Sequence, residues 1–301
     1  MKKNNNFFNF HLLPSENFIT TITLVVIIAI FTLPINVFAK DNKPIHCVDR
    51  EDKKISLTFD VNWAENDYLY EILDLLDENN VKATFFIMGK WVIYPEGNRE
   101  KLVEIHKRGH EIGNHSYVHP DFKNIGKERI IEEVKKTEEI IEKEVGVKTN
   151  LFRFPSGSYS QESLSAIEGL EYKSIQWDVD SVDWKGESKE REYKKVIDNV
   201  KGGSILLYHN NGKYTVENLK EIIPKLKSEG YEFVKISDII YENSYEIDDN
   251  GKQLLIKTKQ NNSWNRWTKC IIMEIVIGYT DKYKKHIKLI WLNTNGERGL
   301  G

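Results

Sequence analysis

The sequence holds two histidines four residues apart, His115 and His119, that could together bind a metal ion. Neutral imidazoles at this spacing can point the same way from one turn of chain, and they suit zinc as well as cobalt or nickel. A metal site needs a third ligand, so the pair by itself is a weak signal. Other ionisable side chains could supply acid, base or ligand chemistry: Asp60, Arg153, Asp178, Asp180, Asp183 and His209.

Each of these residues ends or follows a short apolar run rich in β-branched or aromatic residues, a pattern that predicts β-strands. Amphipathic segments separate most of the runs and predict helices, and Gly109, Gly146 and Gly230 follow helix ends where a left-handed cap is expected. The expected strands span 54–59, 83–87, 111–114, 151–154, 172–176, 204–208 and 232–235. The expected helices span 67–79, 99–107, 126–145, 161–168, 190–200 and 216–229.

Strands that alternate with helices predict an α/β fold with a parallel sheet. The number and length of these units favour a closed or nearly closed barrel, with an open doubly wound sheet as the alternative. In both architectures ligands bind at the carboxyl ends of the strands. The ionisable residues are therefore expected to meet at one face of the sheet.

In their order along the chain, these residues resemble the motifs of the NodB-like polysaccharide deacetylases, carbohydrate esterase family 4. The resemblance covers about 55–240 and implies a distorted (β/α)7 barrel similar to a TIM barrel. The run Thr58-Phe59-Asp60 with Trp63 three residues further on is similar to a sporulation-associated branch of that family. Five family motifs have counterparts in this sequence: Thr58-Phe59-Asp60-Val61, His115 to His119, Arg153-Phe154-Pro155-Ser156, Asp180 to Trp184, and Leu207-Tyr208-His209.

The resemblance implies a metal-dependent hydrolase, a polysaccharide N-deacetylase, that removes acetyl groups from N-acetylglucosamine-type residues of a cell-wall polysaccharide, with peptidoglycan as the expected substrate. It implies a divalent metal ion held by His115 and His119, with zinc expected and cobalt or nickel as alternatives. Amide hydrolysis needs an activated water, a stabilised oxyanion and a proton for the leaving amine. By the resemblance, Asp60 is the general base and His209 the general acid.

The remaining family positions imply supporting roles. Asp183 would orient His209, and Arg153 would pair with Asp60 to keep the carboxyl group ionised. The implied substrate-binding residues are Trp184 and Leu207, which would form an apolar pocket for the acetyl methyl group, together with Pro155 and Ser156, where a backbone N–H would donate to the oxyanion.

Two positions depart from the family pattern. Val61 stands where most members have the aspartate of a His-His-Asp metal site, so Asn62, Asp60 or water is left to complete the coordination. Ser156 replaces an aromatic residue.

These departures leave a catalytically inactive carbohydrate-binding relative as the alternative, with Trp63, Trp91 and Trp184 stacking on sugars. A glycoside hydrolase that uses a pair drawn from Asp178, Asp180 and Asp183 is the other rival function.

The composition excludes a disordered chain, a collagen-like repeat and a polytopic membrane protein: 301 residues are 40% hydrophobic and 30% charged. A net charge of -3 gives no basic excess, so no nucleic-acid partner is expected. Residues 1–39 are expected to be a signal peptide or membrane anchor that places the protein outside the membrane. A deacetylase domain is expected at 40–250, as a monomer, followed by a basic, aromatic extension of unknown role at 251–301.

Overall fold

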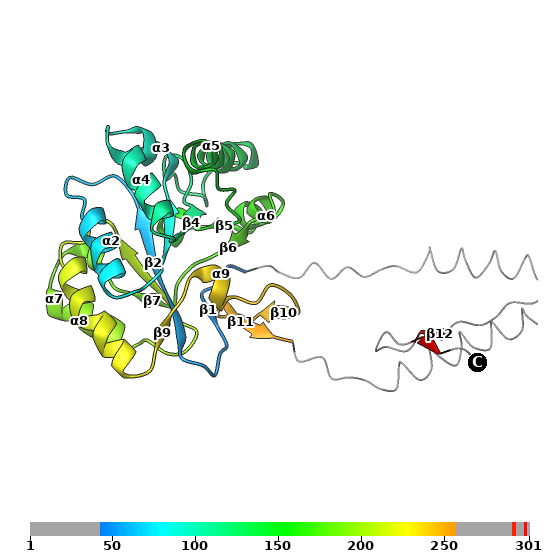
Figure 1. Cartoon of the computed structure of the whole chain (residues 1–301). Helices are drawn as coiled ribbons and strands as arrows, with labels where there is room; N and C mark the ends of the chain where they lie inside the picture. Colours follow the sequence, from blue (N-terminus) through cyan, green and yellow to red (C-terminus); the bar gives the residue numbers. More distant parts are fainter. Residues whose placement is uncertain (1–42, 257–290, 293–297, 300–301) are drawn as a thin grey trace, which may run out of the picture.

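The computed structural model describes residues 43–256, 291–292 and 298–299. The expected signal or anchor segment, 1–39, lies outside the described residues, as does most of the extension at 251–301. In the part of the chain that is described, no helix is both long and apolar enough to span a bilayer. Figure 1 shows a curled sheet at the centre with helices packed around it.

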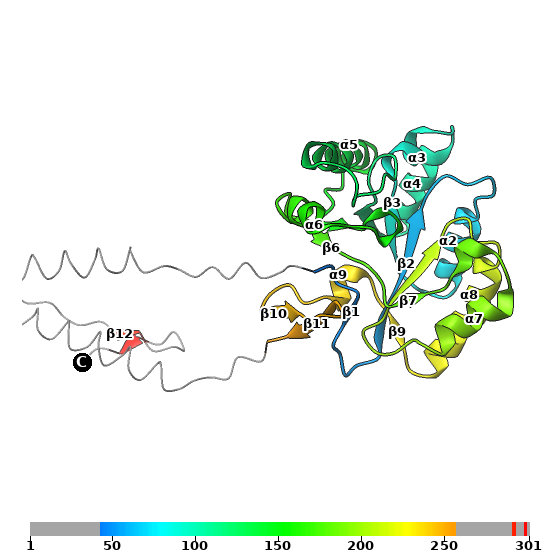
Figure 2. The same cartoon turned by 180° about the vertical axis from the view of Figure 1, so that it is seen from behind.

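The central sheet is parallel throughout, and it curls into a half-barrel (Figures 1 and 2). Its strands β6 and β7 are edges that do not pair with each other, so the barrel is open between them. This arrangement confirms the predicted α/β class and distorted barrel. In spatial order the strands are β6 (Lys173–Ser174), β5 (Leu151–Phe152), β4 (Glu111–Asn114), β3 (Thr84–Ile87), β2 (Lys54–Val61), β8 (Ile205–His209) and β7 (Val179–Asp180), with β9 (Glu232–Phe233) beside β2.

The start of the described chain lies across the open side of the barrel. Ile45 forms a bridge with Ile175, and Cys47 forms one with Ser204. Gly203 permits this approach, because it has a φ of 84° and a Cβ there would lie 1.8 Å from the Val48 carbonyl oxygen. A small sheet is added here by β1 (Cys47–Val48), β11 (Lys252–Leu255) and β10 (Tyr245–Ile247). Strand β11 lies beyond Asn250, where the expected domain ends.

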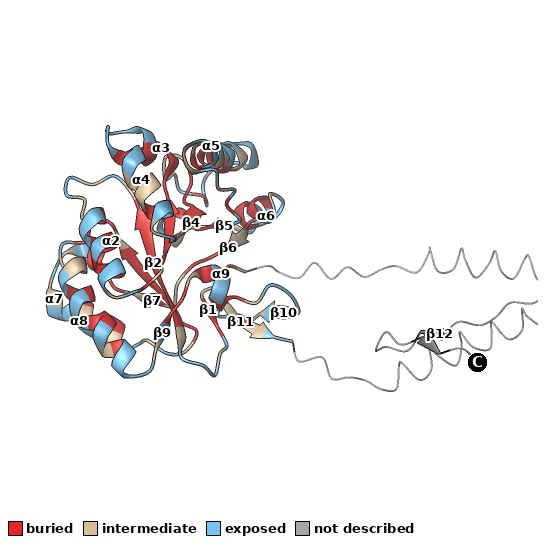
Figure 3. Cartoon of the chain, viewed as in Figure 1, coloured by how far each residue is buried: buried red, intermediate tan, exposed pale blue. Residues whose placement is uncertain are grey.

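The amphipathic segments form the helices that cover the sheet. These are α2 (Leu69–Glu78), α4 (Asn98–Lys107), α5 (Lys127–Val145), α6 (Gln161–Glu168), α7 (Lys189–Ile197) and α8 (Thr215–Ser228). Each of these helices has a buried side and an exposed side, as Figure 3 shows, and most of the buried side chains are apolar. Each Leu or Ile that α2 buries contributes roughly 1.5–3 kcal/mol, so packing rather than helix propensity holds the helix in place.

Several short elements carry no periodic signal and were not predicted: α3 (Gly89–Ile93), α9 (Ile236–Ile239), strand β7, and the 3₁₀ turns η1 (Pro155–Gly157) and η2 (Asp183–Lys185). The predicted glycine caps are confirmed, because Gly109, Gly146 and Gly230 have φ values of 76°, 72° and 86°.

Candidate active site

A cavity of about 500 Å³ lies where the carboxyl ends of the strands meet. Its wall contains both residues expected to move protons, Asp60 and His209, and one expected metal ligand, His119. The whole lining is Asp60, Asn62, Trp63, His119, Ser156, Trp177, Asp180, Trp184, Leu207, His209 and Asn211.

Strand β2 places Asp60 by simple alternation. Leu57, Phe59 and Val61 are wholly buried in the apolar core. Thr58 and Asp60 point the other way and accept hydrogen bonds from Arg153 in the barrel interior. Val61 therefore lies on the face opposite Asp60, which accounts for its burial. Position 61 supplies no metal ligand.

Arg153 fixes the position of Asp60 through hydrogen bonds. Its Nη1 donates to Asp60 Oδ1 at 2.9 Å and to Thr58 Oγ1 at 2.9 Å, and neither member of the pair is more than 4% exposed. Its other donors reach the carbonyl oxygens of Ile175 (3.3 Å) and Gln176 (3.1 Å). Burial acts to raise the pKa of the Asp60 carboxyl, but His115, Arg153 and His209 outweigh burial and lower it. The permanent charge of Arg153 therefore keeps Asp60 ionised at neutral pH.

His115 is positioned as a neutral imidazole. Its Nδ1 donates to the Arg153 carbonyl oxygen at 2.9 Å, which leaves the Nε2 lone pair free. Burial lowers the pKa of His115 to about 4. Nε2 is 3.4 Å from Asp60 Oδ2, and within the described chain this buried atom has no hydrogen-bond partner. The ring of His119 lies 5.0 Å away, centroid to centroid.

The turn that carries the two histidines is fixed by residues that sequence reasoning missed. Glu133 of α5 is 1% exposed, and its Oε2 accepts 2.8 Å hydrogen bonds from the backbone N–H groups of both Tyr117 and Val118. The Ser116 hydroxyl accepts from the His119 N–H at 3.0 Å, and both of these residues have left-handed backbone angles. The signal available was a carboxylate on the buried face of an amphipathic helix.

Asp183 is hydrogen-bonded to His209, the contact that its expected role requires. The His209 Nδ1 donates to Asp183 Oδ1 at 2.8 Å, while Oδ2 accepts from the His209 N–H (2.8 Å) and from the Thr215 hydroxyl (2.7 Å). Burial acts to lower the pKa of His209, but the hydrogen bond and charge of Asp183 outweigh it and raise the pKa. His209 Nε2 therefore remains available for substrate, and Thr215 is a further supporting residue that the sequence did not indicate.

The donor set fits a divalent ion through its two imidazoles. His115 Nε2 is buried and unpaired, and the Arg153 carbonyl that fixes its tautomer is the outer-shell partner typical of a ligating histidine. Within 43–256, however, no group of three or more His, Cys, Asp or Glu residues could hold a metal ion. Asn62 Oδ1 is buried and has no partner there either. The Asn210 side chain holds the backbone of Asn62 by 3.0 and 3.1 Å hydrogen bonds.

The expected substrate-binding residues are divided between the cavity and its support. Trp184, Leu207 and Ser156 line the cavity, whereas Pro155 is buried and does not. Ser156 has a φ of 54°, in the left-handed region. Trp177 also lines the cavity and was missed because its strand end carried no recognised motif.

The structure argues against parts of the rival functions. Trp91 was expected as a sugar platform in the binding-protein alternative, but it is 1% exposed, so that expectation is wrong. Trp63 and Trp184 are 40% and 57% exposed at the cavity. Two of the acidic candidates for glycoside hydrolysis are already hydrogen-bonded within the protein. Asp183 accepts from His209 and Thr215. Asp178 accepts from the Ile205 N–H and the Ser204 hydroxyl.

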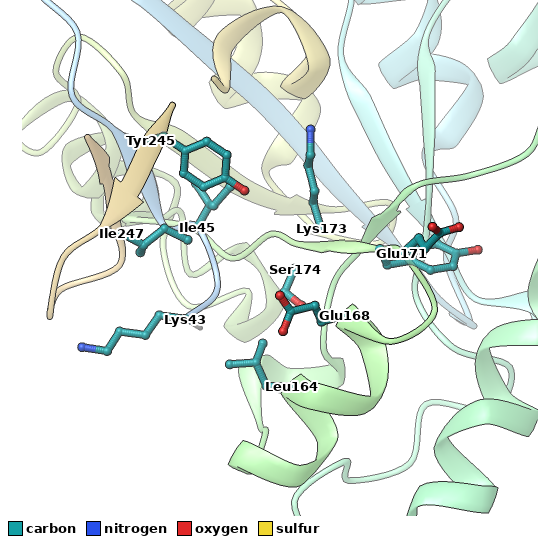
Figure 4. A pocket seen from close by; sticks show the side chains of 10 residues that line it. Lys43, Ile45, Leu164, Glu168, Glu171, Lys173, Ser174, Tyr245 and Ile247 are labelled. Carbon is teal, nitrogen blue, oxygen red and sulfur yellow. The ribbon is translucent and has the colours of Figure 1, made fainter. Parts of the chain in front are cut away.

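A second cavity of about 230 Å³ lies between α6, β6 and β10 (Figure 4). It contains none of the expected site residues, and its wall mixes apolar side chains with charges of both signs. Lys173 in this wall pairs with Glu242 at 2.6 Å. This hollow belongs to the junction of the small sheet with the barrel.

Comparison with known proteins agrees with this fold. The family model described as "Polysaccharide deacetylase" matches residues 48–175. The chain is 34% identical over 196 residues to the peptidoglycan-N-acetylmuramic acid deacetylase PdaA of Bacillus subtilis, covering 64% of this chain and 73% of PdaA. This chain therefore belongs to the polysaccharide deacetylase family, carbohydrate esterase family 4.

Two other relatives are uncharacterised or inactive. The chain is 33% identical over 200 residues to the uncharacterized protein YlxY of Bacillus subtilis, covering 66% of this chain and 61% of YlxY. A carbohydrate esterase family 4 pseudoenzyme from Bacillus anthracis superposes with a TM-score of 0.61 at 34% identity, covering 65% of this chain and 68% of that protein. A mutant of that pseudoenzyme is described as having restored enzymatic activity, and it superposes with the same TM-score.

Proposed function

We propose that this chain is a metal-dependent N-deacetylase that removes acetyl groups from N-acetylglucosamine-type residues of peptidoglycan, outside the cell membrane. The observation that carries the proposal is the pairing of two proton-handling groups in one cavity. Asp60 and His209 both line it, and each is fixed by its own buried partner, Arg153 or Asp183. A binding site for sugar alone would not require an ionised base and a raised-pKa acid at the same place.

Two side chains, Asp60 and His209, carry the proton transfers of the proposed reaction. The charge of Arg153 keeps Asp60 ionised, and the Asp60 carboxylate takes a proton from the water that attacks the acetyl carbonyl carbon. His209 then donates its Nε2 proton to the sugar nitrogen as the C–N bond breaks, while Asp183 keeps the other ring nitrogen protonated. Acetate and a free amine leave, and the water proton on Asp60 replaces the one that His209 lost.

His115 and His119 would hold the metal ion. The ion would polarise the acetyl carbonyl group and lower the pKa of the attacking water to about 7. Asn62 Oδ1 is the protein oxygen that could add to the two imidazoles while Asp60 serves as the base, since a carboxylate bound to the ion could not take the proton. A site with one fewer carboxylate ligand is expected to bind the ion more weakly than a His-His-Asp site. Trp184 and Leu207 would enclose the acetyl methyl group.

The second candidate is an inactive carbohydrate-binding relative, which the burial of Val61 in the core favours. The exposed rings of Trp63 and Trp184 would serve this function equally well, since both can stack on sugar rings.

Acetate release decides between the two candidates. The full chain is stripped of metal, supplied with zinc or cobalt, and incubated with N-acetylglucosamine oligomers and with peptidoglycan glycan strands. The proposal expects metal-dependent acetate and free amines with unchanged chain length, and mass spectrometry of the sugars shows which residue lost its acetyl group. Saturable glycan binding without acetate under every condition would support the inactive relative, and new reducing ends would support a glycoside hydrolase.

A further inference from the structure

Each exposed tryptophan of the cavity wall has a lysine ammonium group against its ring. Lys90 Nζ lies 5.2 Å from the centre of the Trp63 ring. Lys185 Nζ lies 5.0 Å from the centre of the Trp184 ring. Both tryptophans line the cavity that contains Asp60, and they are 40% and 57% exposed. The cavity wall therefore has two places where an aromatic face and a positive charge lie together.

The first of these pairs is fixed by hydrogen bonds at both ends of α3. The backbone N–H of Lys90 donates to the carbonyl oxygen of Tyr117, in the turn between the two histidines, at 2.9 Å. Trp63 Nε1 donates to the carbonyl oxygen of Tyr94, which follows α3 directly, at 2.7 Å. The Trp63 ring and the backbone of Lys90 are therefore fixed relative to each other and to the expected metal ligands.

Neither ammonium group is neutralised by the rest of the described chain. Among residues 43–256, no carboxylate forms an ion pair with Lys90 or Lys185. The two carboxylates of the cavity wall have other partners: Asp60 accepts from a buried guanidinium at 2.9 Å, and Asp180 Oδ1 accepts from a backbone N–H at 2.7 Å. The two positive charges are therefore available to a ligand.

The chemistry of these pairs distinguishes acidic glycans from neutral ones. A sugar ring can stack on a tryptophan whether or not a lysine lies beside it. The lysine adds attraction only when the ligand carries a negative group close to the stacked sugar. Peptidoglycan has such groups, on the lactyl ether of its muramic acid residues or on the peptide attached there. A neutral oligomer of N-acetylglucosamine has none.

We propose that Lys90 and Lys185 are specificity-determining residues that bind the carboxylates of an acidic glycan while Trp63 and Trp184 stack on its sugar rings. This inference rests on the proposed function, because it concerns the substrate of the same cavity. The chain is expected to bind carboxylate-bearing strands more tightly than uncharged strands of the same length. Salt weakens this preference, because the charges involved are open to solvent.

The test is calorimetric titration of the metal-free full chain with peptidoglycan strands that keep their peptides and with strands freed of peptides. Each is used with its carboxylates intact and with them converted to methylamides, which keeps every sugar ring but removes the charge. Wild type is expected to prefer the charged form of at least one strand by about tenfold. That strand identifies the source of the carboxylate, lactyl group or peptide. The preference should fall towards one between about 0.1 M and about 1 M salt, as the Debye length drops from about 10 Å to about 3 Å.

Two substitutions separate the lysine charges from the stacking surfaces. Lys90→Gln and Lys185→Gln should each lower the preference for charged strands about threefold, and the double variant should abolish it. Because the result is a ratio of two affinities in one protein, a general loss of stacking does not affect it. Lys220→Gln changes an exposed lysine of α8 that does not line the cavity, so it is the matched control and should keep the wild-type preference.

Equal affinity of wild type for charged and amidated strands would overturn the proposal, as would no measurable binding of any strand. A preference that survives in a folded double variant would also overturn it. These failures are distinct from failure of the proposed function, because binding is measured without metal and without turnover. Acetate release combined with equal affinities would refute the lysine roles alone. A lysine-dependent preference without acetate release from any glycan would refute the deacetylase and keep the lysine roles.

Discussion

Replacing Arg153 by methionine should destabilise the protein more at neutral pH than in acid. The guanidinium is wholly buried and donates to Asp60, Thr58 and two backbone carbonyl oxygens. Removing one partner of a buried ion pair typically costs about 3–5 kcal/mol, because the other charge is left uncompensated. Part of that cost comes from the two carbonyl groups and does not depend on pH, whereas the part from Asp60 does.

The sign of the pH dependence follows from the Asp60 carboxyl. Its folded-state pKa is lowered below the ordinary 3.8, so the Asp60 contribution is present above that value and is lost as pH falls through the folded pKa. In Arg153→Met the two histidines are left to oppose burial without the buried guanidinium, so the pKa of Asp60 should rise and the variant should regain stability on acidification. The difference in unfolding free energy between wild type and variant should therefore shrink by at least about 1 kcal/mol between pH 7 and pH 4.

Urea denaturation of both proteins at the two pH values measures this difference. Arg99→Met removes a surface pair with Glu144 and is the control, with an expected effect below about 1 kcal/mol at either pH. A loss for Arg153→Met of less than 1 kcal/mol at pH 7, or an equal loss at both pH values, would refute the reasoning that Arg153 keeps a buried Asp60 ionised.

Three further predictions concern other parts of the structure. Asp183→Asn should lower the pKa of His209 by about one unit or more, because a charge-assisted hydrogen bond is lost, and the alkaline limb of the pH–rate profile should shift down equally; an unmoved limb would contradict the assignment of His209. His119→Ala should weaken zinc binding by at least tenfold in calorimetric titration of the metal-free chain, whereas unchanged affinity would place the metal elsewhere. Leu73→Ala in α2 should cost about 2–5 kcal/mol in denaturation experiments without altering zinc affinity, and a loss of zinc binding would contradict the separation of core from site.

The elements were predictable from the sequence where periodicity was strong. The alternation of Leu57, Phe59 and Val61 with Thr58 and Asp60 defines both faces of β2, and the helix α5 shows its buried stripe equally clearly. That same alternation could have placed Val61 in the core at once. Strand β7 and the turn η2 could not be predicted, because two or three residues contain no period and their conformation is imposed by their neighbours.

The ionisable residues of the site were predictable, but their supports were not. Asp60, Arg153, Asp183 and His209 have the pairings expected of them. Glu133 and Thr215 lie on helices whose sequence distance from the site gives no hint of contact, and only packing brings them to the histidine turn and to Asp183. Trp91 was misplaced for the same reason, since an aromatic residue stacks on sugar or fills a core according to tertiary context.

Acetate release by Asp60→Asn, compared with wild type at equal metal loading, tests the central claim most directly. The substitution keeps the shape of the side chain beside Arg153 but removes the base, so kcat should fall by about 10²–10⁴-fold while glycan binding is retained. Glu162→Gln, an exposed carboxyl on α6, is the control and should retain wild-type activity. Metal-dependent release by wild type that Asp60→Asn abolishes is the predicted result. Equal acetate release by the two proteins would contradict the account.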